Sequence, residues 1–227
     1  MTTIGELRKG LEPDFPWYPY DVVSNVWHLS PMMGNLTGLF GPGKVIADIG
    51  AADGDLAFFL ESLGNTCDIY DNPPTNMNGL RGAAAIKRAL RSSVTINTLD
   101  LDTQFAIPGR YDLVVFLGIL YHLKNPFYVL EQLADVSEYM LIITRHLYAG
   151  GPDQSHLPLA YLVGEDELND DATNYWVLTE TGLKRLLGRA GWDIVAFRTV
   201  GDIVGSLPND NAHDERGFAV LKSCRGK

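Results

Sequence analysis

The sequence predicts an α/β protein built on a seven-stranded, mostly parallel sheet with helices on both faces and an antiparallel last strand. Along most of the 227 residues, short β-rich apolar runs alternate with amphipathic segments. The first run, residues 44–49, enters a turn of small residues that is followed by a helical pattern. The last two runs, 192–200 and 217–222, have no helix between them, which is typical of an antiparallel pair. Together these features indicate a Rossmann-like fold.

The expected strands are rich in β-branched and aromatic residues and are bounded by Gly, Pro, Asn or Asp. They are residues 44–49, 66–70, 94–99, 111–118, 139–144, 192–200 and 217–222. The fourth run is almost continuously apolar, as is typical of a strand buried on both faces. We therefore expect it near the centre of the sheet.

The expected helices carry apolar residues at helical spacing and have recognisable end signals. They span residues 21–29, 56–63, 79–92, 126–136 and 179–190. Asp21, Asn125 and Thr179 are the expected N-caps, and Pro126 occupies a first helical position, where its missing N–H costs nothing.

Two segments fall outside this alternation. Residues 1–44 form an N-terminal arm in which five aromatic residues lie between positions 15 and 28, and prolines keep part of it extended. The arm is expected either to form a lid over a ligand site or to anchor on the sheet. Residues 145–178 form a long polar insertion that we expect to face a substrate, because connections of this length are usually functional. Residues 45–227 are expected to be one domain that carries this insertion.

Composition limits the possible partners. The formal net charge is −10, which argues against extended contact with nucleic acid, because neutralising phosphates needs a basic face. No apolar run approaches 18 residues and the N-terminus does not resemble a signal peptide, so we expect a soluble cytoplasmic protein with no membrane partner. Cys67 and Cys224 have no partners at metal-ligand spacing, and we expect no metal. The spacing of His146 and His156 could make a metal site in a loop, but nothing else in the sequence supports such a site.

The turn after the first strand is unusually acidic. Asp48, Asp53 and Asp55 crowd it, which would repel a pyrophosphate but would suit a sulfonium and an ammonium group. Asp71 ends the second strand 23 positions after Asp48, close to the spacing of a carboxylate that accepts hydrogen bonds from both ribose hydroxyls. The sequence therefore predicts a site for a cationic nucleoside.

The motifs also resemble those of a known family. Residues 48–55 read D-I-G-A-A-D-G-D, acids follow the second and third strands at Asp71 and Asp100, and Y-D-L-V-V-F-L-G at 111–118 precedes L-Y-H-L-K-N-P. This set resembles the class I S-adenosylmethionine-dependent methyltransferases. The last segment and residues 166–176 are similar to the subgroup near the tRNA wobble-uridine methoxy- and carboxymethoxy-forming transferases. Ala52 departs from the family, which has Gly there.

The resemblance implies a donor site for S-adenosyl-L-methionine built from four pieces of chain. They comprise a methionine-side loop (Asp48, Gly50, Ala51, Asp53), ribose contacts (Asp71, Asn72), adenine contacts (Asp100, Leu101) and a floor (Leu117, Gly118). The tRNA substrate is not carried over, because no basic surface is evident. We expect a small-molecule acceptor, and the oligomeric state stays open.

Two histidines follow strand ends on the expected ligand side. His122 and His146 are candidates for a base that removes a proton from the acceptor, although a histidine hydrogen-bonded to the backbone fits the pattern equally well. Tyr121 is a candidate for contacting a carboxylate of the donor or acceptor. Three further residues are candidate acceptor contacts, namely Tyr18, Asn174 and Trp176.

Other functions remain open at this stage. An NAD(P)-dependent oxidoreductase shares the strand–turn–helix and the ribose-binding acid, but the chain lacks the G-x-G-x-x-G turn. A catalytically silent nucleoside-binding or scaffold protein would keep the same pocket, since no single residue is indispensable for methyl transfer. A tRNA-modifying methyltransferase is a further alternative, disfavoured by charge.

Overall fold

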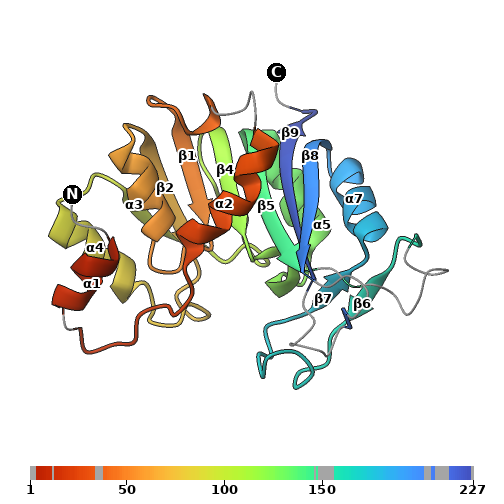
Figure 1. Ribbon diagram of the computed structural model, residues 1–227, viewed down its shortest axis with the longest axis horizontal. Helices are drawn as coiled ribbons and strands as arrows, with labels where there is room; N and C mark the ends of the chain where they lie inside the picture. Colours follow the sequence, from red (N-terminus) through yellow and green to blue (C-terminus); the bar gives the residue numbers. More distant parts are fainter. Residues whose placement is uncertain are drawn as a thin grey trace.

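A seven-stranded sheet runs through the protein in the order β3-β2-β1-β4-β5-β9-β8 (Figure 1). The structure, a computed structural model, describes residues 4–11, 13–33, 38–145, 147, 156–201, 206–207 and 215–225. The sheet strands are β1 (Val45–Ile49), β2 (Thr66–Asp71), β3 (Thr95–Thr98), β4 (Tyr111–Leu117), β5 (Ser137–Arg145), β8 (Trp192–Gly201) and β9 (Glu215–Ser223).

The strand order reverses at β1, which pairs in parallel with β2 on one side and with β4 on the other. Open α/β sheets bind ligands outside the carboxyl ends of the strands at such a reversal. β9 lies between β5 and β8 and is antiparallel to both. The expected fold class is confirmed, including the antiparallel last strand.

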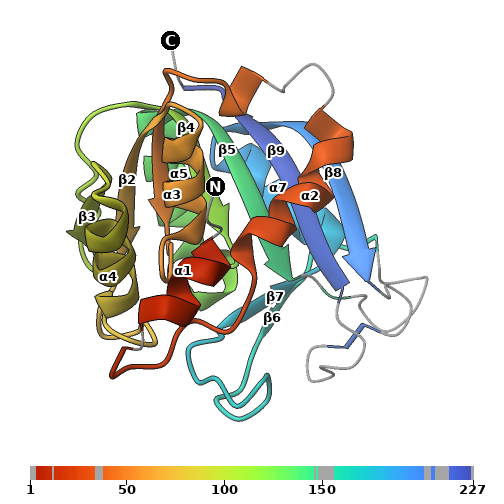
Figure 2. The ribbon, with the colours of Figure 1, turned by 60° about the vertical axis from the view of Figure 1, so that its left-hand side comes forward.

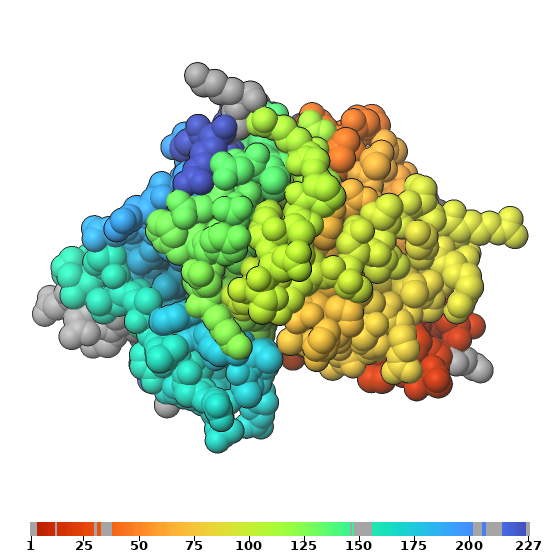
Figure 3. Space-filling view, turned by 180° about the vertical axis from the view of Figure 1, so that it is seen from behind, coloured from red at the N-terminus to blue at the C-terminus, as the bar shows by residue number. Residues whose placement is uncertain are grey.

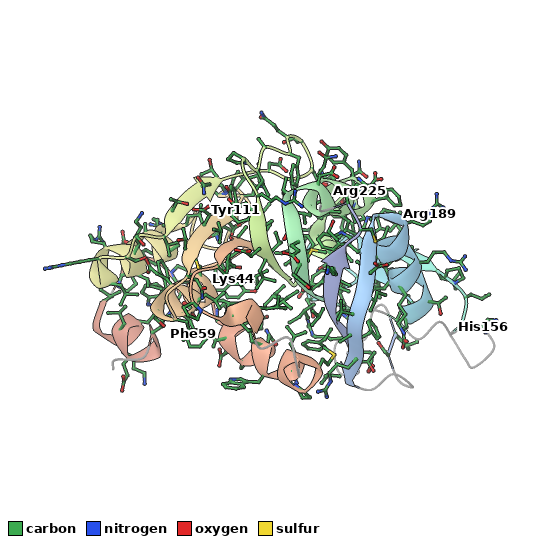
Figure 4. All side chains as sticks on the ribbon, turned by 90° about the horizontal axis from the view of Figure 1, so that it is seen from above. Lys44, Phe59, Tyr111, His156, Arg189 and Arg225 are labelled. Atoms are coloured by element: carbon green, nitrogen blue, oxygen red, sulfur yellow. The ribbon has the colours of Figure 1, made fainter. Side chains whose placement is uncertain are left out.

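Helices cover both faces of the sheet. They are α1 (Ile4–Leu11), α2 (Val22–Met33), α3 (Asp55–Ser62), α4 (Arg81–Leu90), α5 (Pro126–Val136) and α7 (Glu180–Arg189). Buried side chains of α2, α3 and α4 form one core layer, and those of α5 and α7 form the other. α2 crosses β9 and β8 (Figure 2). A view from above separates the two layers of helices, and Lys44 and Tyr111 are labelled there near the starts of strands (Figure 4).

The three expected N-caps are confirmed. The backbone N–H groups of Ser24, Tyr128 and Gly182 donate to the side chains of the three caps. The distances are 3.0 Å to Asp21, 3.4 Å to Asn125 and 3.0 Å to Thr179. These local bonds satisfy donors that the first turn of a helix leaves unpaired.

One helix and one small sheet were not expected. α1 precedes the aromatic stretch, and its Ile4 and Leu7 pack against the core layer of α2 to α4. Within the insertion, β6 (Ala160–Leu162) and β7 (Trp176–Leu178) form a small antiparallel sheet below the main one (Figure 1). In the described part of the chain, no helix is long and apolar enough to cross a membrane.

Candidate functional site

The candidate site lies at the carboxyl ends of β1, β2 and β4, along the lower edge of the molecule in Figure 1. The segment that joins α1 to α2 runs along this edge, and the insertion lies beside it. In the space-filling view this edge is hollowed between the insertion, coloured cyan, and the orange-to-yellow segments that follow β1 and β2 (Figure 3). The arm and the insertion therefore flank the place where the fold favours a ligand.

The turn after β1 needs left-handed backbone at three positions. Gly50, Ala52 and Gly54 have φ values of 68°, 54° and 79°. A Cβ on Gly50 would lie 2.0 Å from Cδ1 of Ile119, so the turn packs directly on the chain after β4. Ala52 adopts a conformation that costs a non-glycine residue roughly 1 kcal/mol. Its N–H donates to Oδ2 of Asp71 at 2.9 Å, which joins the turn to the end of β2.

Asp48 is a buried acid at the end of β1, with 4% of its surface exposed. Its pKa is raised to about 7, mainly by burial and also by the nearby Asp71, while a hydrogen bond from the backbone of Ala57 opposes the shift. Its Oδ2 atom is buried with no hydrogen-bond partner among the described residues. Since a buried acceptor without a partner is costly, this atom suits a ligand that brings a positively charged donor.

Asp71 occupies the expected end of β2, but its carboxylate is largely used by the protein. It accepts hydrogen bonds from the N–H of Ala52 at 2.9 Å, from the N–H of Asn72 at 2.7 Å and from Nδ2 of Asn76 at 3.0 Å. Burial raises its pKa, and these hydrogen bonds oppose the shift. A carboxylate offers about four acceptor positions. These bonds leave about one acceptor position, so a second ribose hydroxyl would have to displace the Asn76 amide, and the expected ribose contact of Asp71 stays a prediction.

Asp53 is also turned toward the protein. Its carboxylate accepts from Nη2 of Arg8 at 2.9 Å, from the N–H of Tyr18 at 2.7 Å and from Nδ2 of Asn78 at 2.7 Å. With 2% of its surface exposed, it is almost fully covered by the surrounding chain. Asp53 connects the turn to the N-terminal arm and to the start of α4, and its expected contact with the donor stays a prediction.

The acids of the turn share one cation. Nη2 of Arg8 lies 2.7 Å from Oδ1 of Asp55 as well as 2.9 Å from Oδ2 of Asp53. Burial raises the pKa of Asp55 to about 6, and the Arg8 charge opposes that shift. In the described ranges, Asp48 and Asp71 have no cation paired with them. The net local charge around the turn is therefore negative.

Aromatic residues lie over the other side of this edge. A Cβ on Gly118 would lie 3.3 Å from the hydroxyl of Tyr121, so that hydroxyl sits above the floor predicted from the sequence. Burial raises the pKa of Tyr18 to about 12, with further contributions from Tyr121 and from Asp71. The hydroxyl of Tyr18 in the arm therefore interacts electrostatically with Asp71, at the end of β2, and with Tyr121, in η2 (Leu120–His122).

The remaining residues that were expected to contact S-adenosylmethionine also lie at this edge. Oδ1 of Asp100 accepts from the N–H of Asp102 at 3.1 Å, which caps its own turn. The side chains of Ala51 and Leu101 are buried in the core, and Leu117 packs against it, so a ligand would meet mainly their backbone. The N–H of Asn72 is used by Asp71.

Of the two histidines expected to act as a base, only His122 lies within the described residues. His122 is in η2, directly after β4, and its Nδ1 lies 3.0 Å from Oγ1 and 3.2 Å from the carbonyl oxygen of Thr173. Burial lowers the pKa of His122, and the charge of Asp171 opposes that shift. His146 lies outside the described residues. His156 is exposed at the outer edge of the insertion (Figure 4).

Two candidate acceptor residues belong to the insertion. Asn174 is 3% exposed, and its Nδ2 donates to the carbonyl oxygens of Leu168 and Asp171 at 3.1 Å each. This amide holds a turn of the insertion, and the expected acceptor contact of Asn174 stays a prediction. Trp176 is half-buried in β7, and its Nε1 has no hydrogen-bond partner among the described residues. It stays a candidate.

Sequence reasoning missed residues that organise the site through long-range contacts. Arg8 had a detectable signal, because Ile4, Leu7 and Leu11 follow helical spacing and predict an amphipathic turn beside it. Asn76 and Thr173 carried no such signal, since isolated Asn and Thr residues occur in most loops.

Comparison with known proteins supports the architecture. No family model matches the chain, and no curated protein matches it. Among solved structures, the N-terminal domain of EvdMO1, determined in the presence of SAH and D-fucose, has a TM-score of 0.64 at 19% identity, with 97% of this chain and 95% of that chain covered. A putative methyltransferase from Bacillus halodurans has a TM-score of 0.59 at 12% identity, with coverages of 85% and 96%.

A third similar structure is that of a cyclase. The [4+2]-cyclase SpnF has a TM-score of 0.65 at 12% identity, covering 98% of this chain and 92% of that one. At these identities the likeness shows the fold, which is shared by methyltransferases and by a protein titled a cyclase.

Proposed function

We propose that the protein binds S-adenosyl-L-methionine at the carboxyl end of β1 and transfers its methyl group to a small-molecule acceptor. The observation that carries the proposal is the buried Oδ2 of Asp48, which lacks a partner among the described residues within an acidic turn. A ligand with a positive charge would supply the missing donor and offset the local negative charge. EvdMO1, a similar structure, was solved with SAH bound, which agrees with this choice of ligand.

The residues present fit that group. Asp48 would face the ammonium side of the ligand, the free acceptor position of Asp71 would take one ribose hydroxyl, and Asp100 would accept from the adenine amino group. Gly118 leaves the floor open beneath the hydroxyl of Tyr121. Phosphate-bearing dinucleotides fit poorly, because the same acids would repel a pyrophosphate.

When bound, the sulfonium supplies an activated methyl group, so the main task of the protein is to position the acceptor in line with it. The arm and the insertion are the segments available for that task. Tyr18 reaches the site from the arm and Trp176 belongs to the insertion, so we infer that the arm acts as a lid on the acceptor side. His122 would take the acceptor proton.

The acceptor class follows from charge. A net charge of −10 and an acidic site disfavour a tRNA substrate, despite the motif at 120–126 that resembles the tRNA-acting subgroup. We expect a small molecule, a cytoplasmic enzyme and no membrane partner.

The similarity to a protein titled a cyclase favours one second candidate. The fold could hold the nucleoside while the acceptor side does other chemistry or none. In that case S-adenosylhomocysteine would bind, but no methylated product would form with any acceptor.

Calorimetric titration at pH 8 with S-adenosylhomocysteine and, separately, with NADH tests the proposal. We expect binding of the first alone, and a loss of at least tenfold in Asp48→Asn, because a hydrogen bond to a charged group is worth about 1.5–3 kcal/mol. Asp135→Asn, an exposed acid on α5, is the matched control and should bind like the wild type. Binding of NADH alone, or of neither ligand, would contradict the proposal.

A further inference from the structure

Residues of the insertion determine how His122 is held. Nδ1 of His122 approaches two oxygens of one residue, Oγ1 of Thr173 at 3.0 Å and the carbonyl oxygen of Thr173 at 3.2 Å. The hydroxyl of Thr173 is itself 2.5 Å from Oδ1 of Asp171, which also accepts from the N–H of Thr173 at 2.9 Å. Three residues therefore form a short chain that leads from a carboxylate to the imidazole.

The direction of the hydrogen bonds in this chain is fixed by the donor inventory. A carboxylate only accepts, so the Thr173 hydroxyl must donate its single proton to Asp171. That hydroxyl can then only accept from His122, and the Thr173 carbonyl oxygen also only accepts. Both neighbours of Nδ1 therefore require a proton on Nδ1. In a neutral imidazole this leaves a lone pair on Nε2.

We propose that Asp171 and Thr173 are positioning residues that hold His122 as the neutral Nδ1–H tautomer. Nε2 is then free to take the proton from the group that becomes methylated. The inference deepens the function proposed above and rests on it. The base would thus be prepared by the insertion, 51 residues further along the chain.

The insertion is attached to η2 at a second point, which keeps this geometry rigid. The N–H of Tyr175 donates to the carbonyl oxygen of Tyr121 at 2.7 Å. Nζ of Lys124 lies 5.7 Å from the centre of the Tyr175 ring, and β7 packs against η2. The insertion is therefore bound to the chain on both sides of His122, which holds Thr173 beside the imidazole.

Methyl transfer and the accompanying proton transfer need only the methyl donor, the acceptor and His122. A lone pair of an acceptor oxygen or nitrogen forms the bond to the methyl carbon, and the sulfur–carbon bond breaks with its electron pair left on sulfur. The acceptor proton passes to Nε2 of His122. The products are a neutral thioether, the methylated acceptor and an imidazolium that returns its proton to solvent.

Charged and titratable groups around η2 come from three segments, and burial rather than these groups favours a neutral imidazole at His122. Asp171 of the insertion is one, Tyr121 lies beside it with ring centres 4.4 Å apart, and Arg145 ends β5, which packs against η2. Burial lowers the pKa of His122, and Asp171 opposes the shift.

Nitrogen-15 NMR of protein labelled at its five histidines tests the inference without an acceptor. His122→Gln assigns the signal. At pH 7.5 we expect His122 to have a protonated Nδ1 and an unprotonated Nε2. Thr173→Val should lower the Nδ1–H fraction and Thr173→Ser should restore it, whereas a purely structural role would leave the tautomer unchanged. An Nε2–H tautomer or an imidazolium in the wild type would overturn the inference, as would a tautomer unaffected by Thr173→Val.

A second variant tests the same hydrogen-bond chain in case Thr173→Val does not fold. Asp171→Asn keeps an oxygen acceptor for Thr173 but removes the charge, so it should lower the pKa of His122 while the Nδ1–H tautomer persists. An unchanged or raised His122 pKa would contradict the chain. Titration with S-adenosylhomocysteine on the same samples separates the two proposals: the tautomer result stands or falls with the Asp171–Thr173 chain, and the binding result with the donor site.

Discussion

The backbone N–H of Tyr18 donates a 2.7 Å hydrogen bond to Oδ2 of Asp53, 35 residues further along the chain. The same oxygen accepts from Nη2 of Arg8 at 2.9 Å. The carbonyl oxygen of Pro16 accepts from Nδ2 of Asn78 at 3.2 Å, which fixes the arm to the start of α4 as well. The N-terminal arm is thus hydrogen-bonded to the acidic turn beside the proposed donor site.

Arg8→Ala should lower the free energy of unfolding by about 1–3 kcal/mol, because it leaves two mostly buried carboxylates, Asp53 and Asp55, without their cation. Urea unfolding measures the change. Lys9→Ala, which removes the adjacent exposed cation, is the control and should change stability by less than about 0.5 kcal/mol. Equal effects of the two substitutions would show that the pair with Asp53 does not hold the arm.

Asp48 should make the protein less stable as pH rises. Its pKa is raised from 3.8 to about 7 in the folded state, so between these values the folded state binds more protons than the unfolded state. The free energy of unfolding therefore falls across this window. Relative to Asp48→Asn, the wild type should lose roughly 4 kcal/mol between pH 4 and pH 8. Denaturant unfolding at both pH values measures this, and a pH-independent difference between the two proteins would contradict the buried, ionisable Asp48.

The same titration should appear in ligand binding. A cation binds the ionised form of Asp48, whose population rises through pH 7, so affinity for S-adenosylmethionine should increase roughly tenfold between pH 6 and pH 8. Calorimetry at three pH values measures it. Asp48→Asn controls for titration of the ligand itself and of Asp55. Should the variant keep the full pH dependence, another group is responsible.

Thr179 should be important for stability because its hydroxyl serves two segments. It accepts from the N–H of Gly182 and from the N–H of Leu159, at 3.0 Å each, and donates to the carbonyl oxygen of Leu157 at 2.6 Å. Thr179→Ala should cost about 2 kcal/mol or more, since it removes an N-cap and leaves buried polar groups unpaired. Thr179→Ser keeps the hydroxyl and should recover most of that loss in thermal unfolding. If Thr179→Ala left the stability unchanged, the result would mean that water replaces these hydrogen bonds.

Much of the fold could be predicted from the sequence because the signals are local. Seven strands, five helices and three caps each depend on residue types within a few positions, and the near-continuous apolar run at 111–118 marks a strand buried on both faces. The antiparallel last pair followed from the missing helix between the last two runs. α1 was overlooked, although its apolar spacing was present in residues 4–11.

The sequence by itself determined the sheet, its caps and the place of an acidic turn at the carboxyl end of the first strand. Only the tertiary structure decided which atoms of that turn remain available: Asp53 serves the arm, Asp71 is mostly occupied, and Asp48 retains an oxygen that has no hydrogen-bond partner among the described residues. It also placed Thr173 against His122. The physical reason is that secondary structure depends on neighbours along the chain, whereas the direction in which a carboxylate or imidazole bonds depends on donors brought from tens of residues away by packing.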